Sequence, residues 1–282
     1  MELKDIQSVV VWRLIFKHLM NNSPKSLSNF SITCKSIRQK INVIYNWKEI
    51  ALKNLPEAVN IANILGINVD KEPEHSLKWA SMYQYYRFIY PASKFGHIVH
   101  MNTQYLQSLE SSKLDAILPF SHIVHLNFVW WFEVGELIKD IPVNNYKVYW
   151  LLRNDGLVKT LQSEVEIEGS SEPITQNMVV ERSPMEWKYF RGPDISPDQD
   201  IYPRGSLFSL FCRLHERDCA RTKGNLDIAY VLLVPSDDDH HKPPKILFKH
   251  PNHDDDKNNN DNNNNNNTDS PSLMTRLFKY FQ

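Results

Sequence analysis

Two adjacent tryptophans and a glutamate form the segment of this 282-residue chain whose side chains are best suited to bind a ligand. Trp130, Trp131 and Glu133 lie in an apolar run over residues 126–138 that has the composition of a β-strand. Neighbouring residues of a strand face opposite sides of the sheet, so one indole would fill the core while the other lies outside. An exposed indole can stack on the apolar face of a sugar ring while a carboxylate accepts hydrogen bonds from its hydroxyls. The alternative is that both indoles are buried.

Histidine and cysteine patterns give little support for a metal site. The tetrapeptide His-Ile-Val-His occurs at residues 97–100 and again at 122–125, but residues three apart on a strand point to opposite faces. Cys212, His215 and Cys219 would share one face of a helix and are acceptable zinc ligands, although no fourth ligand is evident. We therefore predict neither a metal ion nor another cofactor.

Motifs of catalysis are also missing from the sequence. The chain has no glycine-rich phosphate loop, no His-Glu-x-x-His and no Gly-x-Ser-x-Gly, and only 8 glycines to build such turns. We expect a protein that is not an enzyme.

Composition narrows the class of partner. The 32 basic and 33 acidic side chains nearly cancel, so no basic field favours nucleic acid. No apolar run approaches the length of a signal or membrane helix, which predicts no membrane partner. Three cysteines, Cys34, Cys212 and Cys219, are too few for a disulfide framework. We expect free thiols and a cytoplasmic and/or nuclear location.

Two short amphipathic helices are predicted near the start of the chain. In residues 23–41 the apolar side chains recur at steps of three and four, which places them on one helical stripe, and Ser23 before Pro24 is a typical helix start. A second stripe lies just upstream, in residues 11–19. The break between them is so short that the two helices must pack together.

This pair resembles the F-box, a three-helix module with a leucine-ending helix, a short break and a second helix carrying Cys-Lys. Two departures are the missing Leu-Pro opening and Ile37 where an aromatic is common, while the Trp-Lys segment at 46–56 continues the likeness. The resemblance implies a surface for a Skp-type adaptor, which links to a cullin scaffold. The residues that it assigns to this surface are Leu14, Ile15, Leu19, Pro24, Leu27, Phe30, Cys34 and Ile37.

The middle of the chain is predicted to be helical and then β. Residues 58–67 indicate a short helix, 70–75 an exposed loop, and 77–88 an aromatic cluster that packs in a core or between domains. From about residue 98, short apolar runs divided by turn residues indicate antiparallel strands.

Several strands can be placed within this β half. Tyr146, Val148, Trp150 and Leu152 alternate with a mixed face, and the Asn-Asp-Gly turn at 154–156 predicts a hairpin with residues 157–167. Five prolines make 170–205 too broken for continuous strands except at 186–190. Residues 207–214 fit strand or helix, and 225–234 indicates a closing strand.

The tryptophan strand resembles the phloem-protein-two, or Nictaba-like lectin, domain. The likeness rests on Val129-Trp130-Trp131-Phe132-Glu133-Val134 and the tyrosine-rich run at 146–152, and it covers about residues 120–234. It implies a jelly-roll-like β-sandwich with a glycan site. In plants this domain is often joined to an F-box, so the two resemblances support one another.

The amino-acid composition changes towards the end of the chain. Residues 236–270 are rich in Asp and Asn and cannot bury enough surface to fold, so we expect a disordered linker. Residues 271–282 predict a short amphipathic tail that docks on the protein or folds on a partner.

The predicted fold class is therefore α+β: an N-terminal helical F-box-like module, a mostly antiparallel jelly-roll-like β-sandwich and a disordered Asn-rich tail. The expected divisions are 1–55 for the module, 56–95 for a helical and aromatic linker, 96–235 for the sandwich, then 236–270 and 271–282. The first functional hypothesis is the substrate-recognition adaptor of an SCF-type ubiquitin ligase, with a protein or glycoprotein target. The alternative is a lectin-like carbohydrate-binding protein without that role. A third is an interaction protein with neither activity.

Overall fold

The computed structural model of the protein describes residues 46–236 apart from 103, 111–117, 157, 185 and 204. The F-box-like segment, with all eight residues of the expected adaptor surface, lies outside the described residues. So do the Asp/Asn-rich linker and the amphipathic tail.

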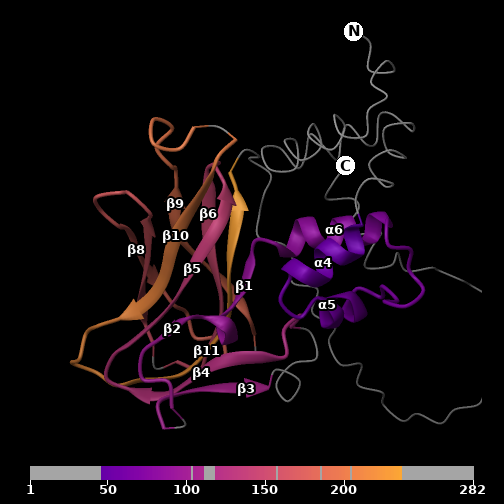
Figure 1. Ribbon diagram of the computed structural model, residues 1–282. Coiled ribbons are helices and arrows are strands. Elements are labelled where there is room, and N and C mark those ends of the chain that lie inside the picture. Colours follow the sequence, from indigo (N-terminus) through magenta and orange to yellow (C-terminus); the bar gives the residue numbers. More distant parts are fainter. Residues whose placement is uncertain are drawn as a thin grey trace, which may run out of the picture.

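Two antiparallel sheets packed face to face form most of the described chain (Figure 1). The six-stranded sheet has the order β3-β4-β11-β6-β9, with β1 paired to β11, and the five-stranded sheet has the order β2-β5-β10-β7-β8. This confirms the predicted antiparallel β-sandwich. The strands are β1 Ile89–Pro91, β2 His97–Ile98, β3 Leu106–Glu110, β4 His122–Val129, β5 Phe132–Pro142, β6 Tyr146–Asn154, β7 Thr160–Ile167, β8 Ile174–Val179, β9 Lys188–Ile195, β10 Leu207–Glu216 and β11 Lys223–Pro235.

The apolar faces of the two sheets meet in one core. The inward residues of β6 are Tyr146, Val148, Trp150 and Leu152, as their alternation predicted. The Trp150 indole is fully buried, and its Nε1 donates to Ser163 Oγ at 2.9 Å. This bond across the sandwich satisfies the polar edge of a large core residue, as buried tryptophans require.

In the part of the chain that the structure describes, three helices precede the sandwich and cover one of its outer faces. They are α4 Trp47–Asn54, α5 Ala58–Ile64 and α6 Leu77–Tyr86. The side chains of Asn46 and Ser76 cap α4 and α6 by accepting from backbone N–H groups of the first turn. The helix expected at 58–67 is thus confirmed, although it ends at Ile64. None of these described helices is long and apolar enough to span a membrane.

The helices pack against the outer side of the six-stranded sheet. In Figure 1 the indigo helices lie beside the sandwich, on the side away from β8 and β10. Trp47, Ile61 and Trp79 share one buried cluster with Leu151 of β6 and Tyr230 of β11. The chain enters the six-stranded sheet through β1, and a short 3₁₀ turn, η2 Ala92–Lys94, follows that strand. The boundaries expected at 55/56 and 95/96 stay predictions.

The expected single strand at 126–138 is wrong, because the chain forms two strands there. β4 ends at Val129 in the six-stranded sheet, and β5 begins at Phe132 in the other sheet. The apolar run continues across the junction because both strand ends are buried, so composition alone does not mark the change of sheet.

The predicted hairpin of 146–153 with 157–167 is also wrong. β6 pairs with β11 and β9, whereas β7 pairs with β10 and β8 in the opposite sheet. The turn itself exists: Gly156 has a φ of 109°, and Asn154 Nδ2 donates to Val158 O at 2.7 Å. Alternation predicts which face of a strand is apolar but not which strand lies beside it.

The prolines of residues 170–205 exclude fewer strands than expected. β8 forms where no strand was predicted, while β9 overlaps the exception at 186–190 and continues through Pro193. β9 is an edge strand, and its pairing with β6 shifts register around this proline, a place where a missing N–H is tolerated. Residues 207–214, for which the sequence left strand and helix open, belong to strand β10. Residues 225–234 belong to the closing strand β11, as expected.

Candidate functional site

The outer face of the five-stranded sheet carries the largest polar cluster of the described chain. Outward side chains from adjacent strands form three cross-strand rows, because register places their Cα atoms side by side. The rows are His97-Gly135-Arg213-Glu164, then Glu133-His215-Gln162, then Leu137-Phe211-Glu166. No described helix covers this face. It is the open counterpart of the helix-covered face of the other sheet.

Glu133 lies at the centre of an ion-pair network. Arg217 donates to its Oε2 from Nη2 at 2.7 Å and from Nε at 3.2 Å. The other oxygen, Oε1, lies 3.0 Å from His97 Nε2 and 3.4 Å from Arg213 Nη1. The Glu133 side chain is only 12% exposed, whereas that of Arg217 is 52% exposed. The carboxylate therefore holds its partners in place and leaves Arg217 facing solvent.

A second carboxylate extends the network towards β7. Glu164 Oε1 lies 3.2 Å from Arg213 Nε, and its Oε2 lies 3.3 Å from His215 Nε2. Arg213 also reaches Glu166 Oε2 at 3.2 Å with Nη2. Arg213 thus contacts three glutamates on two strands, which fixes its planar guanidinium group against the sheet.

The network shifts two pKa values in ways that its geometry explains. Burial acts to raise the pKa of Glu133, but Arg217, Arg213 and His97 outweigh it and hold that pKa below the usual value. Burial and the nearby Arg217 lower the pKa of His215, although Glu164 opposes them. The His215 side chain is almost fully buried, and its Nδ1 has no hydrogen-bond partner among the described residues. Neutral pH therefore favours a charged Glu133 beside a neutral His215.

An aromatic ring lies in the middle of the charged face. The half-buried Phe211 ring is 5.8 Å from the His97 ring, and the Arg213 guanidinium carbon lies 5.0 Å from its centroid. Gly135 makes room for this ring, since a Cβ there would lie 3.1 Å from Phe211 Cζ and 2.7 Å from the Cys212 carbonyl oxygen. The glycine lets the neighbouring strand and the ring approach closely.

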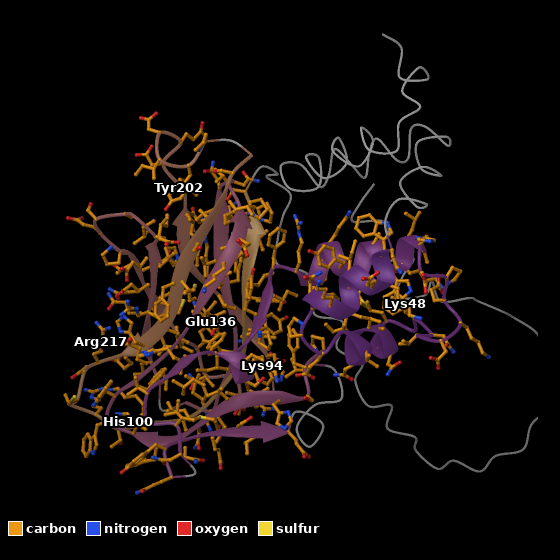
Figure 2. The ribbon with its side chains drawn as sticks, viewed as in Figure 1. Lys48, Lys94, His100, Glu136, Tyr202 and Arg217 are labelled. Atoms are coloured by element: carbon orange, nitrogen blue, oxygen red, sulfur yellow. The ribbon has the colours of Figure 1, made fainter. Side chains whose placement is uncertain are left out.

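The two tryptophans form the turn between β4 and β5, at one end of this face. Trp130 is 57% exposed. Trp131 is half-buried, and its ring lies 4.6 Å from that of His100 in an edge-to-face contact. The backbone N–H of Val99 donates to the Glu133 carbonyl at 2.9 Å, which joins the His100 loop to the start of β5. Figure 2 shows His100 and Arg217 on the side of the sandwich away from the helices.

The structure therefore brings the expected ligand residues together but changes their roles. One indole does face outward, yet the reason is a turn between two sheets rather than alternation along one strand. Glu133 is not a free acceptor beside Trp130, because two arginines and a histidine occupy its oxygens. Ligand binding by Trp130, Trp131 and Glu133 stays a prediction.

Four residues of the site were missed from the sequence: Glu164, Phe211, Arg213 and Arg217. His97 and His215 were considered only as metal ligands, whereas they belong to the ion-pair network. A signal was present, since the polar or aromatic members at 211, 213 and 215 alternate with apolar residues at 210, 212 and 214. The strand-or-helix ambiguity of 207–214 hid that period.

A metal site is not found in the described part of the chain. No group of three or more His, Cys, Asp or Glu side chains there could hold an ion. Cys212 is buried inside the sandwich and Cys219 is exposed beyond the end of β10, so the helical face that would join them with His215 does not form. Cys212 and Cys219 are free thiols among the described residues, while Cys34 lies outside them.

Comparison with known proteins gives only weak structural similarity. No protein-family model matches the chain, and no curated protein matches it. Solved structures that resemble it include the C-terminal CBM6 of LamC, a marine laminarinase from Zobellia galactanivorans, at 10% identity and a TM-score of 0.34, covering 52% of this chain and 97% of that one. A family 35 carbohydrate-binding module from Clostridium thermocellum has 12% identity and a TM-score of 0.34, with 51% and 95% covered.

A larger structure gives a similar match. The cycloisomaltooligosaccharide glucanotransferase of a Paenibacillus species, in complex with cycloisomaltoheptaose, has 12% identity and a TM-score of 0.34. The match covers 51% of this chain but only 18% of that one. At such identities and scores these neighbours say nothing about a ligand of this protein.

Proposed function

We propose that this protein is a lectin-like carbohydrate-binding protein that takes a glycan or glycoprotein on the outer face of the five-stranded sheet. The observation that carries the proposal is the exposed Trp130 indole at the end of an open face of fixed, ion-paired side chains. The sequence resemblance to the Nictaba-like lectin domain, which includes both tryptophans and Glu133, supports the same function.

The chemistry of the face suits a sugar. Trp130 offers an apolar surface for the C–H side of a sugar ring, and Phe211 offers a second ring among charged groups. Arg217 uses Nε and Nη2 on Glu133, which leaves its Nη1 donors for hydroxyl groups. Glu166 is more than half exposed and can accept from hydroxyls. Donors, acceptors and apolar rings thus occur on one surface.

The ion pairs also prepare this surface for binding. Arg213 and Arg217 are held by carboxylates before any ligand arrives, so little side-chain freedom is lost on binding. The face is open rather than deeply hollowed, and a few stacking and hydrogen-bond contacts support an affinity from about micromolar to millimolar.

A glycan array with the full chain tests the proposal. Trp130→Ala is expected to weaken binding of any retained glycan by about tenfold or more, because the stacking surface is lost. Val59→Ala removes a comparably exposed apolar side chain from α5, on the helix-covered side, and is expected to change nothing. Absence of any glycan ligand, or equal binding by Trp130→Ala, would contradict the proposal.

The F-box-like pattern of residues 11–41 favours a second role, as the substrate-recognition adaptor of an SCF-type ubiquitin ligase. In this hypothesis the first two predicted helices hold a Skp-type adaptor, and the sandwich captures a protein or glycoprotein target. Leu19→Asp combined with Leu27→Asp is expected to abolish co-purification of the adaptor and cullin. Unchanged co-purification would remove this role and leave carbohydrate binding alone.

A further inference from the structure

The chain crosses between the two sheets at two places that lie next to each other. The Trp130–Trp131 turn is one of these crossings. β4 continues into β5 through residues 130–131, and β10 continues into β11 through residues 217–222. Val129 lies opposite Lys223 in one sheet, and Phe132 lies opposite Glu216 in the other. The two crossings are therefore neighbours in space as well as in topology.

Lys223, the first residue of β11, joins the two crossings. Its Nζ donates to the backbone carbonyl of Trp130 at 2.9 Å, and the residue is only 5% exposed. Within the part of the chain that the structure describes, no carboxylate lies within ion-pair distance of this ammonium group. Burying a charged group without a counter-charge is costly. The hydrogen bond to the Trp130 carbonyl oxygen therefore offsets part of the cost of burying the Lys223 ammonium group.

A second contact holds the other end of the same turn. Arg217 begins the neighbouring crossing, and its guanidinium pairs with Glu133, which follows the turn on β5. The turn is thus held by Lys223 through the Trp130 backbone and by Arg217 through Glu133. Trp131 has its own contact with His100, whereas no described ring or guanidinium packs on the Trp130 indole. The position of the Trp130 side chain therefore depends on its backbone.

We infer that Lys223 is a positioning residue for Trp130, and that it fixes the backbone of the turn from which the indole projects towards the ligand. The role in binding rests on the proposed carbohydrate function, while the effect on the turn does not. An aromatic side chain on a fixed backbone binds more tightly than one on a mobile turn, because less freedom is lost on contact.

Fluorine NMR of the full chain labelled with fluorotryptophan tests the effect on the turn. The chain has 7 tryptophans, and Trp130→Phe identifies the Trp130 signal by its loss. Lys223→Met keeps the length of the side chain and removes the ammonium group, so the Trp130 signal is expected to shift and broaden. The signals of the buried Trp47, Trp79 and Trp150 are expected to stay in place, which a general loss of structure would not allow.

Two further variants serve as controls in the same measurement. Lys223→Arg keeps the charge and the donors and is expected to retain the signal of the unaltered protein. Lys188→Met removes a surface lysine of β9 and is expected to leave Trp130 unchanged. Should Lys223→Met fail to fold, Lys223→Gln replaces it as a neutral variant with a shorter reach. An unchanged Trp130 signal in the folded neutral variant would overturn the inference.

Binding to the glycan selected on the array adds the functional measurement. Lys223→Met is expected to bind about tenfold more weakly, the cost of ordering one mobile side chain on contact, and Lys223→Arg nearly as well as the unaltered protein. Equal binding by Lys223→Met would also overturn the positioning role. If the unaltered protein binds no glycan, the carbohydrate proposal fails, and the NMR measurement alone decides the effect of Lys223 on the turn.

Discussion

Glu133 illustrates how far the chemistry of a residue depends on its neighbours. From the sequence it is a carboxylate two positions after a tryptophan, which suggests an acceptor for a ligand hydroxyl. In the folded chain Arg217, Arg213 and His97 occupy both of its oxygens, so Glu133 itself leaves a ligand only the unused donors of its partner Arg217. The sequence predicts the position of the polar group but not which member of the network faces solvent, because the partners come from strands far away along the chain.

His215 makes the stability of the protein depend on pH. Its pKa in the folded chain lies below the ordinary value of 6.5, because the ring is buried near Arg217. The unfolded chain therefore takes up a proton first as the pH falls, so stability is full above about pH 6.5 and is lost below it, by at most about 1.4 kcal/mol per pH unit. Urea unfolding from pH 7 downwards is expected to show this slope, and His215→Gln is expected to reduce it. His122→Gln, outside the network, serves as control, and equal slopes for His215→Gln and the unaltered protein would contradict the assignment.

Replacement of Trp130 or Trp150 by alanine is expected to destabilise the protein to very different extents. Trp130→Ala should change the free energy of unfolding by less than about 1 kcal/mol, because the indole is mostly in solvent. Trp150→Ala should cost about 3–5 kcal/mol, since it empties the core and leaves Ser163 Oγ without its donor. Urea denaturation of the two variants measures both. A large loss for Trp130→Ala would show that the indole supports the fold.

At the scale of strands, local patterns predicted faces well and partners poorly. The inward set of β6 follows from period-two alternation, which depends only on neighbouring residues. The pairing of β6 with β11 and β9, rather than with β7, depends on how two sheets close around one core. Local patterns also fail to predict the division of 126–138 into β4 and β5, because the apolar run contains no residue that marks the change of sheet.

The pairing of β4 with β11 is expected to depend on Gly224. A Cβ at this position would lie 2.3 Å from the backbone carbonyl oxygen of Asn127, which cannot move without breaking the pairing. Gly224→Ala should therefore cost about 1–3 kcal/mol of unfolding free energy, as overpacking does. Gly96→Ala is the matched control, because its Cβ would meet only the Glu136 side chain at 3.5 Å. Equal stability of the two variants in urea unfolding would show that the strands can separate slightly at no cost.

At the scale of the described molecule, one outer face of the sandwich is covered by helices and the other is exposed. Helices α4 to α6 bury the outward residues of β6 and β11, including Leu151 and Tyr230. The other sheet keeps an outer face of arginines, glutamates and histidines with no described helix over it. The sequence indicated a helical and aromatic segment before the sandwich. It did not indicate which face these helices would cover, because that depends on apolar residues turned outward from strands more than fifty positions away.

This shared burial predicts that helices and sandwich unfold together. Trp47 and Trp79 report on the helices, and Trp150 reports on the core between the sheets. Because Trp79 packs in the same cluster as Leu151 and Tyr230, loss of the helices would expose an apolar sheet face, so partial unfolding is unfavourable. Fluorine signals from the three tryptophans are expected to disappear at one common urea midpoint, and Trp79→Ala should lower that midpoint for Trp150 as well. Earlier loss of the Trp47 and Trp79 signals, with Trp150 unaffected, would instead show that the helices form a separate unit with a boundary near residue 95.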